Sequence, residues 1–513
     1  MPQAGRGVNR KACYNRADAR RVQTNCGGLV GGQVDSNETV PGAESRVRVD
    51  RSPRSIAGID QKWLVLLAVG VGTFMSALDG SVVNTVLPVM RDTFGSEVAT
   101  VEWVVTIYLL VVSGLLLSFG RLGDLRGHKV IYVSGFAMFV LGSALCGLAP
   151  TVTTLIAFRA LQALGAAMLF ANSPAILTKS FPSAQRGQAL GLQATMTYLG
   201  LTVGPSLGGW LTVQLGWRAV FYINVPVGLL ASLLSLRFIP RDPAAEHTER
   251  FDVAGAATFM GGLVALLLGL NQGHDWGWSS PAILMLLAAA VLLLGAFLVI
   301  ERRVSNPMLD LSLFQRRLFS AATGSAVINY ICLYSVLFAL PFYLIQGRGL
   351  SPAQAGLLLT VQPLVMAIAA PISGTLSDRI GSRLPATLGM TILGVGLLLL
   401  SRVGPDSPLN RVAIALAVVG LGIGIFISPN TSALMGSAPR HQQGIASGVL
   451  ATARNVGMVL GVGLAGAFVT TILAQGEVTG SATALFDGVS AAFLVATGFA
   501  ALGILTSAVR GNG

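Results

Sequence analysis

The sequence predicts an all-α polytopic membrane protein of two six-helix bundles plus two extra central helices, about fourteen spans in all. The first observation is the composition: 53% of 513 residues are hydrophobic and only 11% are charged, with a mean hydropathy of +0.70. The second is that the apolar runs are about 18 to 26 residues long, enough to cross roughly 30 Å of hydrocarbon at about 1.5 Å per residue. The third is a charged motif that occurs twice. These observations exclude a soluble globular protein and a transmembrane β-barrel.

The chain divides into four parts. Residues 1–60 are polar and rich in Arg, Gly, Asn and Ser, and we expect a disordered cytoplasmic tail. A first six-helix bundle is predicted over 61–240, a two-helix insertion over 241–305 and a second six-helix bundle over 306–513. The predicted spans are 63–88, 101–120, 130–149, 152–178, 188–213, 219–239, 253–271, 281–300, 318–346, 353–376, 386–402, 411–435, 444–474 and 486–508.

A charged hinge separates the second and third spans. It reads Gly120-Arg121-Leu122-Gly123-Asp124-Leu125-Arg126-Gly127-His128-Lys129. We expect a short turn in which the glycines allow close helix approach and Asp124 accepts hydrogen bonds from the N-terminus of the helix that follows. Arg121 and Lys129 are expected to pair with carboxylates or phospholipid head groups.

The hinge has a weaker second copy, which indicates an internal duplication. Gly374-Thr375-Leu376-Ser377-Asp378-Arg379-Ile380-Gly381-Ser382-Arg383 follows at an offset of 374 − 120 = 254 residues. A Gly-x-x-x-Gly pair likewise opens the fifth and eleventh spans, at Gly187 and Gly444, with an offset of 444 − 187 = 257. Two halves related in this way are typical of transporters that work by alternating access.

The basic residues are distributed as the positive-inside rule requires. The net charge is +12, but the basic residues are scattered through short loops, so nucleic acid is not an expected partner. Most of them fall on one face, which we predict to be cytoplasmic, with both termini on that side of the cell membrane. The four cysteines lack metal-ligand spacing, and neither a metal site nor a disulfide is predicted.

Four motifs resemble the major facilitator superfamily, and within it the fourteen-span drug:proton antiporter family. Besides the hinge they are Leu78-Asp79-Gly80-Ser81-Val82-Val83-Asn84-Thr85-Val86-Leu87-Pro88, Arg159-Ala160-Leu161-Gln162-Ala163-Leu164-Gly165 and Gly200-Leu201-Thr202-Val203-Gly204-Pro205-Ser206-Leu207-Gly208-Gly209. One departure is His128, where the family often has Arg, so the charge at this position can depend on pH.

The resemblance implies two conformational devices. The first is a gating latch that holds one conformation and breaks in the other, formed by Gly120, Arg121, Asp124, Gly127, Lys129, Asp378 and Arg383. The alternative is a lipid-facing turn held by charges. The second is an antiporter motif that seals the outer side between the halves, formed by Gly200, Gly204, Pro205, Gly208 and Gly209. The alternative is ordinary close packing of membrane helices.

Few ionisable residues lie inside the spans, and a charge within hydrocarbon marks a functional site by default. Asp79 lies about sixteen residues into the first span and Arg159 about seven residues into the fourth, which runs the other way, so both fall at comparable depth. Asp79 is the only deeply placed carboxylate and is therefore the predicted proton-coupling residue, with Arg159 beside it. Glu102, at the outer edge of the second span, could add a second proton site. The structural alternative is an Asp79 that only hydrogen-bonds neighbouring backbone.

Other polar side chains within the spans could line a substrate cavity or equally make helix–helix hydrogen bonds. They are Asn84, Gln162, Gln193, Asn329, Tyr330, Gln362, Asn430 and Arg454. No phosphate-binding G-x-x-x-x-G-K-[ST] loop is present in the sequence, so a proton gradient rather than ATP or another cofactor is expected to supply the energy.

The sequence therefore predicts a non-enzymatic, monomeric exporter of hydrophobic or cationic small molecules, driven by protons across the lipid bilayer. Three alternatives remain: a dedicated exporter of one antibiotic or metabolite, a membrane receptor or scaffold that does not transport, and an uptake symporter. The glycine-rich motif disfavours the symporter, and the intact Asp79 and hinge charges disfavour the scaffold.

Overall fold

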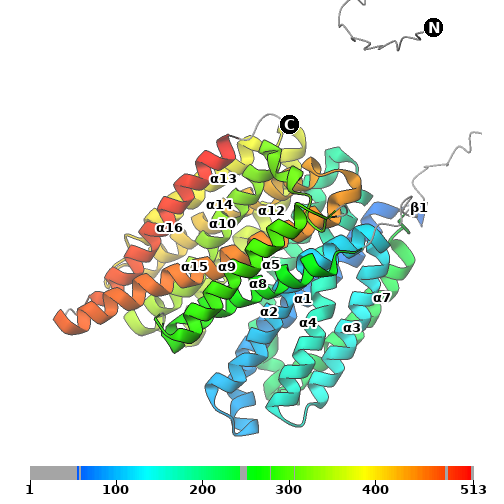
Figure 1. Ribbon diagram of the computed structural model, residues 1–513. Helices are drawn as coiled ribbons and strands as arrows, with labels where there is room; N and C mark the ends of the chain where they lie inside the picture. Colours follow the sequence, from blue (N-terminus) through cyan, green and yellow to red (C-terminus); the bar gives the residue numbers. More distant parts are fainter. Residues whose placement is uncertain are drawn as a thin grey trace, which may run out of the picture. The chain divides into compact units, whose positions relative to one another are not determined.

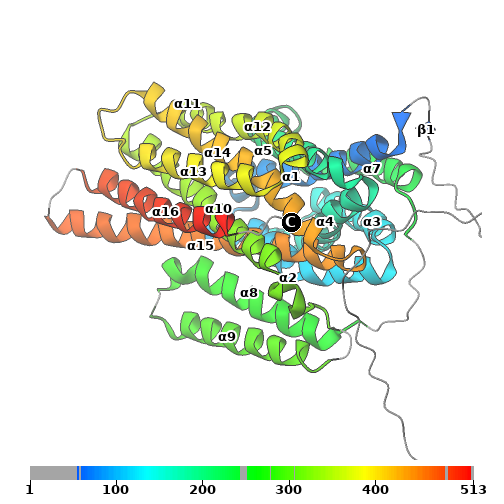
Figure 2. The ribbon, with the colours of Figure 1, turned by 90° about the horizontal axis from the view of Figure 1, so that it is seen from above.

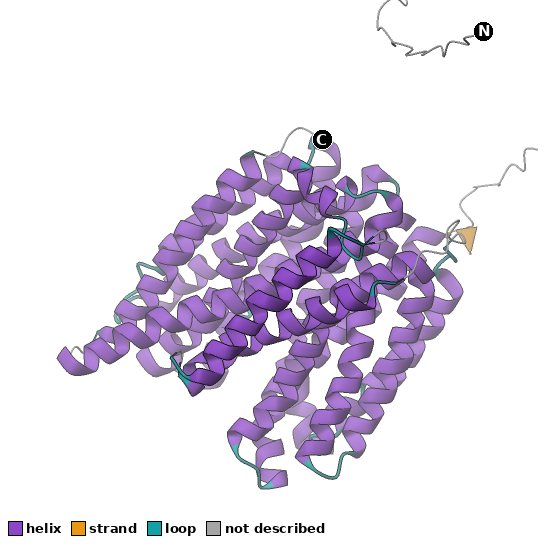
Figure 3. Ribbon diagram, in the orientation of Figure 1, coloured by secondary structure: helices purple, strands orange, loops and turns teal. Residues whose placement is uncertain are grey.

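The computed structural model describes residues 55–56, 59–242, 251–277, 279–304, 307–479 and 483–509. Figure 3 shows that almost all of these residues are helical. Short loops join the helices, and the only strands among the described residues form a short antiparallel pair, β1 (Ser55–Ile56) and β2 (Ile59–Asp60). The predicted tail falls almost entirely outside the described residues.

The first half consists of six spans. Their helices are α1 (Gln61–Phe94), α2 (Val98–Arg126), α3 (His128–Leu148), α4 (Val152–Ser180), α5 (Arg186–Leu215), the single turn α6 (Ala219–Tyr222) and α7 (Asn224–Phe238). The 3-10 turn η1 (Ser183–Gln185) precedes α5. Each helix covers the predicted span to within a few residues, because runs of apolar residues of membrane-crossing length leave little choice of structure.

The second half repeats this arrangement. Its elements are η2 (Leu311–Gln315), α10 (Arg317–Pro341), the π-helical turn η3 (Phe342–Gly347), α11 (Pro352–Leu359), α12 (Val361–Ile380), α13 (Arg383–Leu400), α14 (Leu409–Ser437), η4 (Arg440–Gln442), α15 (Gln443–Thr479) and α16 (Ala484–Ala508). Within the described residues, thirteen helices are long and apolar enough to cross a membrane. The remaining predicted span is α5, which is 30 residues long but rich in Gly, Thr and Gln.

The predicted insertion is a helical hairpin, α8 (Val253–Trp276) and α9 (Pro281–Glu301). The two helices pack on each other, and α8 also contacts α2 and α15. Figures 1 and 2 show both helices side by side along one flank of the two halves. The hairpin therefore lies at the periphery of the two halves and does not separate the helices through which the halves contact each other.

The hinge is not the short turn that the sequence predicted. Helix α2 continues through Arg126, and Gly127 alone, with φ of 94°, separates it from α3. In the repeat, α12 ends at Ile380, and Gly381 has φ of 84°. A positive φ is disfavoured for residues with a Cβ, which explains a glycine at both corresponding positions, 381 − 127 = 254 residues apart.

The two halves meet mainly where α5 packs on α12 and α2 packs on α15. We call the end of the molecule that carries residues 120–129 and 374–383 the hinge end. There, a Cβ at Gly120 would collide with the backbone of Gly444, and a Cβ at Gly187 would collide with the backbone of Gly374. Glycine at these four positions therefore lets the helices of opposite halves touch backbone to backbone.

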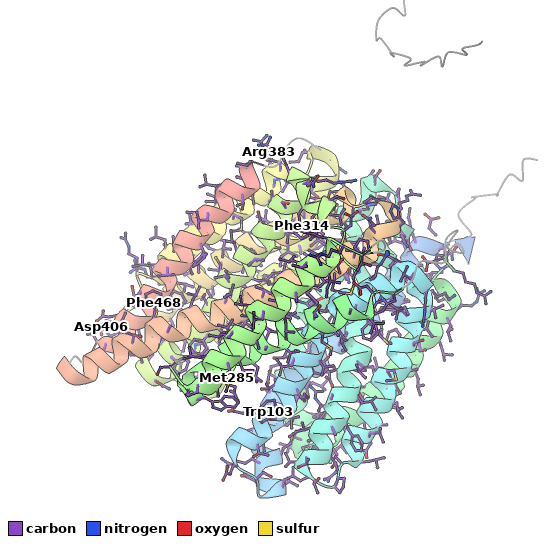
Figure 4. All side chains as sticks on the ribbon, in the orientation of Figure 1. Trp103, Met285, Phe314, Arg383, Asp406 and Phe468 are labelled. Carbon is purple, nitrogen blue, oxygen red and sulfur yellow. The ribbon has the colours of Figure 1, made fainter. Side chains whose placement is uncertain are left out.

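The outer faces are strongly apolar. On α9, for example, Met285 is 66% exposed and Leu292 is 73% exposed, and Figure 4 shows the Met285 side chain projecting from the helix. Arg383 and Asp406, which flank α13, lie at opposite ends of the second half (Figure 4). Apolar faces with charged ends are expected of helices that cross a lipid bilayer.

Candidate functional site

The structure joins Asp79 and Arg159 in a buried ion pair inside the first half. The Arg159 Nη1 lies 2.8 Å from Asp79 Oδ2, and the two side chains are 1% and 0% exposed respectively. Gln162 donates to Asp79 Oδ1 at 3.0 Å, and Asn224 donates to the same oxygen at 2.8 Å. The carboxylate thus accepts three hydrogen bonds, two of them from neutral amides, which suits its ionised form.

Arg159 is held from several sides. Its Nε donates to the Val104 carbonyl at 3.2 Å, and its guanidinium carbon lies 4.2 Å from the ring centre of Tyr108 and 5.7 Å from that of Phe221. These contacts come from α2 and α6, while Arg159 itself lies on α4 and Asp79 on α1. A desolvated guanidinium is tolerable because an opposite charge, a carbonyl and two aromatic faces surround it.

Three members of this cluster were not predicted from the sequence. They are Asn224, which binds Asp79; Ser143, whose hydroxyl lies 2.6 Å from Gln162 Nε2; and Tyr108, which stacks on Arg159. Asn224 is a single amide within an otherwise apolar sixth span, and that isolation was the available signal. Glu102, in contrast, is exposed near the start of α2 and does not join the cluster.

The hinge carboxylates bind across the boundary between the halves. Asp124 accepts hydrogen bonds from the backbone N–H groups of Gly444 and Ile445, each at 2.9 Å. Asp378 accepts from those of Gly187 and Gln188, at 2.8 and 2.9 Å. The expectation that Asp124 would cap the next helix is therefore wrong. It caps α15 of the other half, because α2 extends one and a half turns further than predicted and carries the carboxylate there.

The other hinge residues surround this contact. Arg121 is buried, and the Lys129 Nζ donates to the carbonyls of Leu236 and Ile239 at 2.7 and 2.6 Å, at the C-terminal end of α7. His128 is 1% exposed; one ring nitrogen lies 2.7 Å from Asn172 Oδ1 and the other 3.3 Å from Asp124 Oδ1. Arg383, at the start of α13, is exposed.

The glycine-rich motif of α5 packs against α1 of the same half. A Cβ at Gly200 would lie 2.6 Å from the Phe74 carbonyl oxygen, and one at Gly208 would lie 2.7 Å from Thr85 Oγ1. A Cβ at Gly204 would collide with the Ser81 side chain, whereas one at Gly209 would meet nothing within 4 Å. Gly200, Gly204 and Gly208 thus do not form the expected seal between the halves in this conformation. They let α1 and α5 approach closely, and Pro205 of the same motif is exposed.

The remaining candidate residues occupy different environments. Gln162 belongs to the Asp79 cluster, while Asn84 is exposed and bonds its own helix at Gly80. Asn329, Gln362 and Asn430 are buried in the second half, with Asn430 donating to the Ala322 carbonyl at 3.1 Å. The half-buried ones are Gln193, Tyr330 and Arg454. Among the residues described by the structure, no cluster of three potential metal ligands occurs.

A duplicated bundle of membrane-crossing helices with a buried charge pair and matched contacts between its halves defines a multi-pass membrane transporter. The chain belongs to the Major Facilitator Superfamily, whose sequence profile matches residues 69–254 and 322–510. It operates within a lipid bilayer, on a small-molecule substrate.

Among its relatives is the riboflavin transporter RibZ of Clostridioides difficile, 36% identical over 81% of this chain and 89% of that protein. The tetracenomycin C resistance and export protein of Streptomyces glaucescens is 33% identical over 79% of this chain and 75% of that protein. Among solved structures, the human organic anion transporter MFSD10 superposes with a TM-score of 0.62 at 17% identity, covering 86% of this chain and 99% of that one. The last comparison shows the fold alone.

Proposed function

We propose that this protein is a proton-driven antiporter that exports drug-like small molecules across the cytoplasmic membrane, with both termini on the cytoplasmic side. The observation that carries the proposal is the buried cluster around Asp79. A carboxylate in hydrocarbon has to be neutralised by a proton or by a cation, and Arg159 lies 2.8 Å away to serve as that cation. Protonation and ion pairing are thus exclusive alternatives at one site.

Such exclusivity provides a means of coupling. In the present conformation Asp79 has no exposed surface, so proton uptake requires a second conformation in which the pair opens. When a proton neutralises Asp79, the Arg159 charge loses its partner, and the state that best solvates or rebinds that guanidinium becomes favoured. Export would follow if that state releases cargo on the outer side.

The contacts at the hinge end support alternating access. Asp124 and Asp378 hold the two halves together there, and their release would let this end open. With the hinge end on the cytoplasmic side, as the basic loops indicate, the present conformation corresponds to one that is closed towards the cytoplasm.

A dedicated exporter of one antibiotic is the second candidate. It is favoured by the similarity to a protein named for tetracenomycin C resistance and export. The same fold and cluster would serve both functions, and the breadth of cargo distinguishes them.

The test uses purified protein in liposomes with an imposed pH gradient and a panel of neutral, anionic and cationic fluorescent compounds. We expect gradient-dependent movement of at least one compound, abolished by a protonophore and by Asp79→Asn. Asp406→Asn, which removes an exposed carboxylate, is the matched control. Unchanged transport by Asp79→Asn would defeat the coupling assignment, and movement of a single compound class would favour the dedicated exporter.

A further inference from the structure

A second arginine, Arg454, is half-buried deep in the membrane region and lacks the compensation that Arg159 has. It follows the start of α15 by 454 − 443 = 11 residues, roughly 16 Å along the helix at about 1.5 Å per residue. Its neighbour Asn455 donates to Ser113 at 2.8 Å, and Ser113 lies at the middle of α2. Arg454 is therefore close to mid-depth, where an uncompensated charge is most costly.

Within the described part of the chain, Arg454 has no ion pair and no hydrogen bond. Its guanidinium makes a cation–π contact with the ring of Phe170 of α4, whose centre lies 5.1 Å from the guanidinium carbon. The deep carboxylate, Asp79, is already engaged by Arg159, Gln162 and Asn224. Five N–H donors on Arg454 thus face no oxygen acceptor in this conformation.

Tyrosines from both halves gather around this charge. Gly457 and Gly461, three and seven residues after Arg454 and so on the same helix face, pack on α10, with a Cβ at Gly457 lying 2.7 Å from Tyr330 Cβ. Tyr330 and Tyr334 of α10 pack against the hydrophobic cluster that contains Tyr198, and all three phenols lie within electrostatic reach of Arg454. Tyr198 belongs to α5 of the first half, yet it packs within the hydrophobic cluster of the second. The group therefore spans the boundary between the halves.

The phenol hydroxyls are also unused. Tyr108, which contacts Arg159 and lies within electrostatic reach of Arg454, is 5% exposed. Its buried hydroxyl has no hydrogen-bond partner in the described chain. The hydroxyls of Tyr198, Tyr330 and Tyr334 make no hydrogen bond there either. The buried Tyr108 hydroxyl costs free energy while it has no partner, and a guanidinium beside phenols that are available to donate suits an anionic ligand with an aromatic body.

We propose that Arg454 binds the oxyanion, such as a carboxylate, of an aromatic cargo whose rings lie among Tyr198, Tyr330 and Tyr334. The inference rests on the proposed transport function and names its substrate class: aromatic organic anions in place of the hydrophobic or cationic molecules expected from the sequence. A guanidinium pairs with carboxylate oxygens through parallel N–H donors, the phenols donate to the same oxygens, and aromatic faces cover the body of the ligand. The same unpaired charge repels a cationic cargo from this position.

The test measures binding of three matched probes to purified protein in nanodiscs of phosphatidylcholine at pH 7. The probes are pyrene-1-butyrate, its neutral amide and the corresponding trimethylammonium compound. We expect wild type to bind the butyrate about tenfold or more tightly than either of the others. Arg454→Gln should weaken the butyrate about tenfold and leave the amide unchanged, and Arg454→Lys should restore part of the difference. Arg411→Gln, which removes an exposed charge from the same half, is the matched control.

Equal binding of the three probes by wild type, or unchanged butyrate binding by Arg454→Gln, would overturn the proposal. Phosphatidylglycerol added to the nanodiscs tests the other source of an oxyanion. If Arg454→Gln alters binding only when this lipid is present, the residue serves a lipid head group and the cargo assignment is wrong. A different result would refute the transport proposal. In that case a proton gradient would drive none of the probes across a membrane, whatever their relative affinities for the protein.

Discussion

Asp124 and Asp378 make the same contact in opposite directions, each capping a helix that belongs to the other half. Asp124 holds the first N–H groups of α15 at 2.9 Å, and Asp378 holds those of α5 at 2.8 and 2.9 Å. The residues are 378 − 124 = 254 positions apart, which is the offset of the duplication. Because a carboxylate at a helix N-terminus is favoured by both hydrogen bonding and the helix dipole, the pair forms two matched clasps at the hinge end.

Neutralising either clasp should favour conformations open at the hinge end. Asp124→Asn or Asp378→Asn keeps one acceptor and loses one charge-assisted bond, worth about 1.5–3 kcal/mol, which corresponds to a shift of roughly tenfold or more in the conformational ratio. The measurement is maleimide labelling of Ser447→Cys in a background without other cysteines, since Ser447 is 1% exposed near the start of α15. Labelling should accelerate about tenfold in either variant.

Asp406→Asn serves as the control for the clasps, because Asp406 is an exposed carboxylate at the opposite end of α13. It should leave the labelling rate at the value of the parent. Equal rates for the parent, Asp124→Asn and Asp378→Asn would show that other contacts hold this end closed.

Two glycine-to-alanine substitutions should have different effects, one on transport and the other on stability. Gly120→Ala places a methyl group against the Gly444 backbone of the other half, so closure at the hinge end is blocked and transport should fall about tenfold or more. Gly204→Ala collides with Ser81 inside the first half, so it should instead lower the free energy of unfolding by about 1–3 kcal/mol. Thermal unfolding and transport are measured on both.

Gly209→Ala is the matched control, since a Cβ there meets nothing within 4 Å. If Gly204→Ala were as stable as Gly209→Ala, the packing assignment for the α5 glycines would be wrong. A fully active Gly120→Ala would refute the requirement for backbone contact between the halves.

Asn224→Ala removes one of the three donors to Asp79 without creating a new charge. A hydrogen bond to a charged group contributes about 1.5–3 kcal/mol, so the variant should be destabilised by that amount while Arg159 still pairs with the carboxylate. Thermal unfolding measures the loss. Asn84→Ala, which removes an exposed amide that bonds its own helix, should change the stability little, and an equal effect of both variants would contradict the role of Asn224.

The spans could be predicted because membrane-crossing length and hydropathy are local properties of the sequence. The depths of Asp79 and Arg159 followed from counting residues along two antiparallel helices, and the structure joins them at 2.8 Å. The helical rise was sufficient to predict that the two residues pair, because an ionised side chain within hydrocarbon needs a partner of opposite charge at the same depth.

Partners that are distant in sequence could not be predicted in the same way. Asp124 was expected to cap the helix after it, but it binds residues 320 and 321 positions further along. Gly200, Gly204 and Gly208 share a helix face, which predicts close packing but does not say whether α1 or the other half is the neighbour. Asn224 was not predicted for the same reason. Its amide can bind Asp79 only because α7 packs beside α1, and the sequence does not show this packing.

Arg159 and Arg454 should respond oppositely to loss of their charge. Arg159→Gln leaves the buried Asp79 carboxyl without its counter-charge, and breaking a buried pair from one side costs about 3–5 kcal/mol. Arg454→Gln removes a charge that has no carboxylate partner among the described residues, so the ligand-free protein should keep or gain stability. Thermal unfolding of both variants without ligand makes the comparison. A loss for Arg454→Gln as large as that for Arg159→Gln would mean that Arg454 is paired within the protein, and the space beside it would then need no anionic cargo.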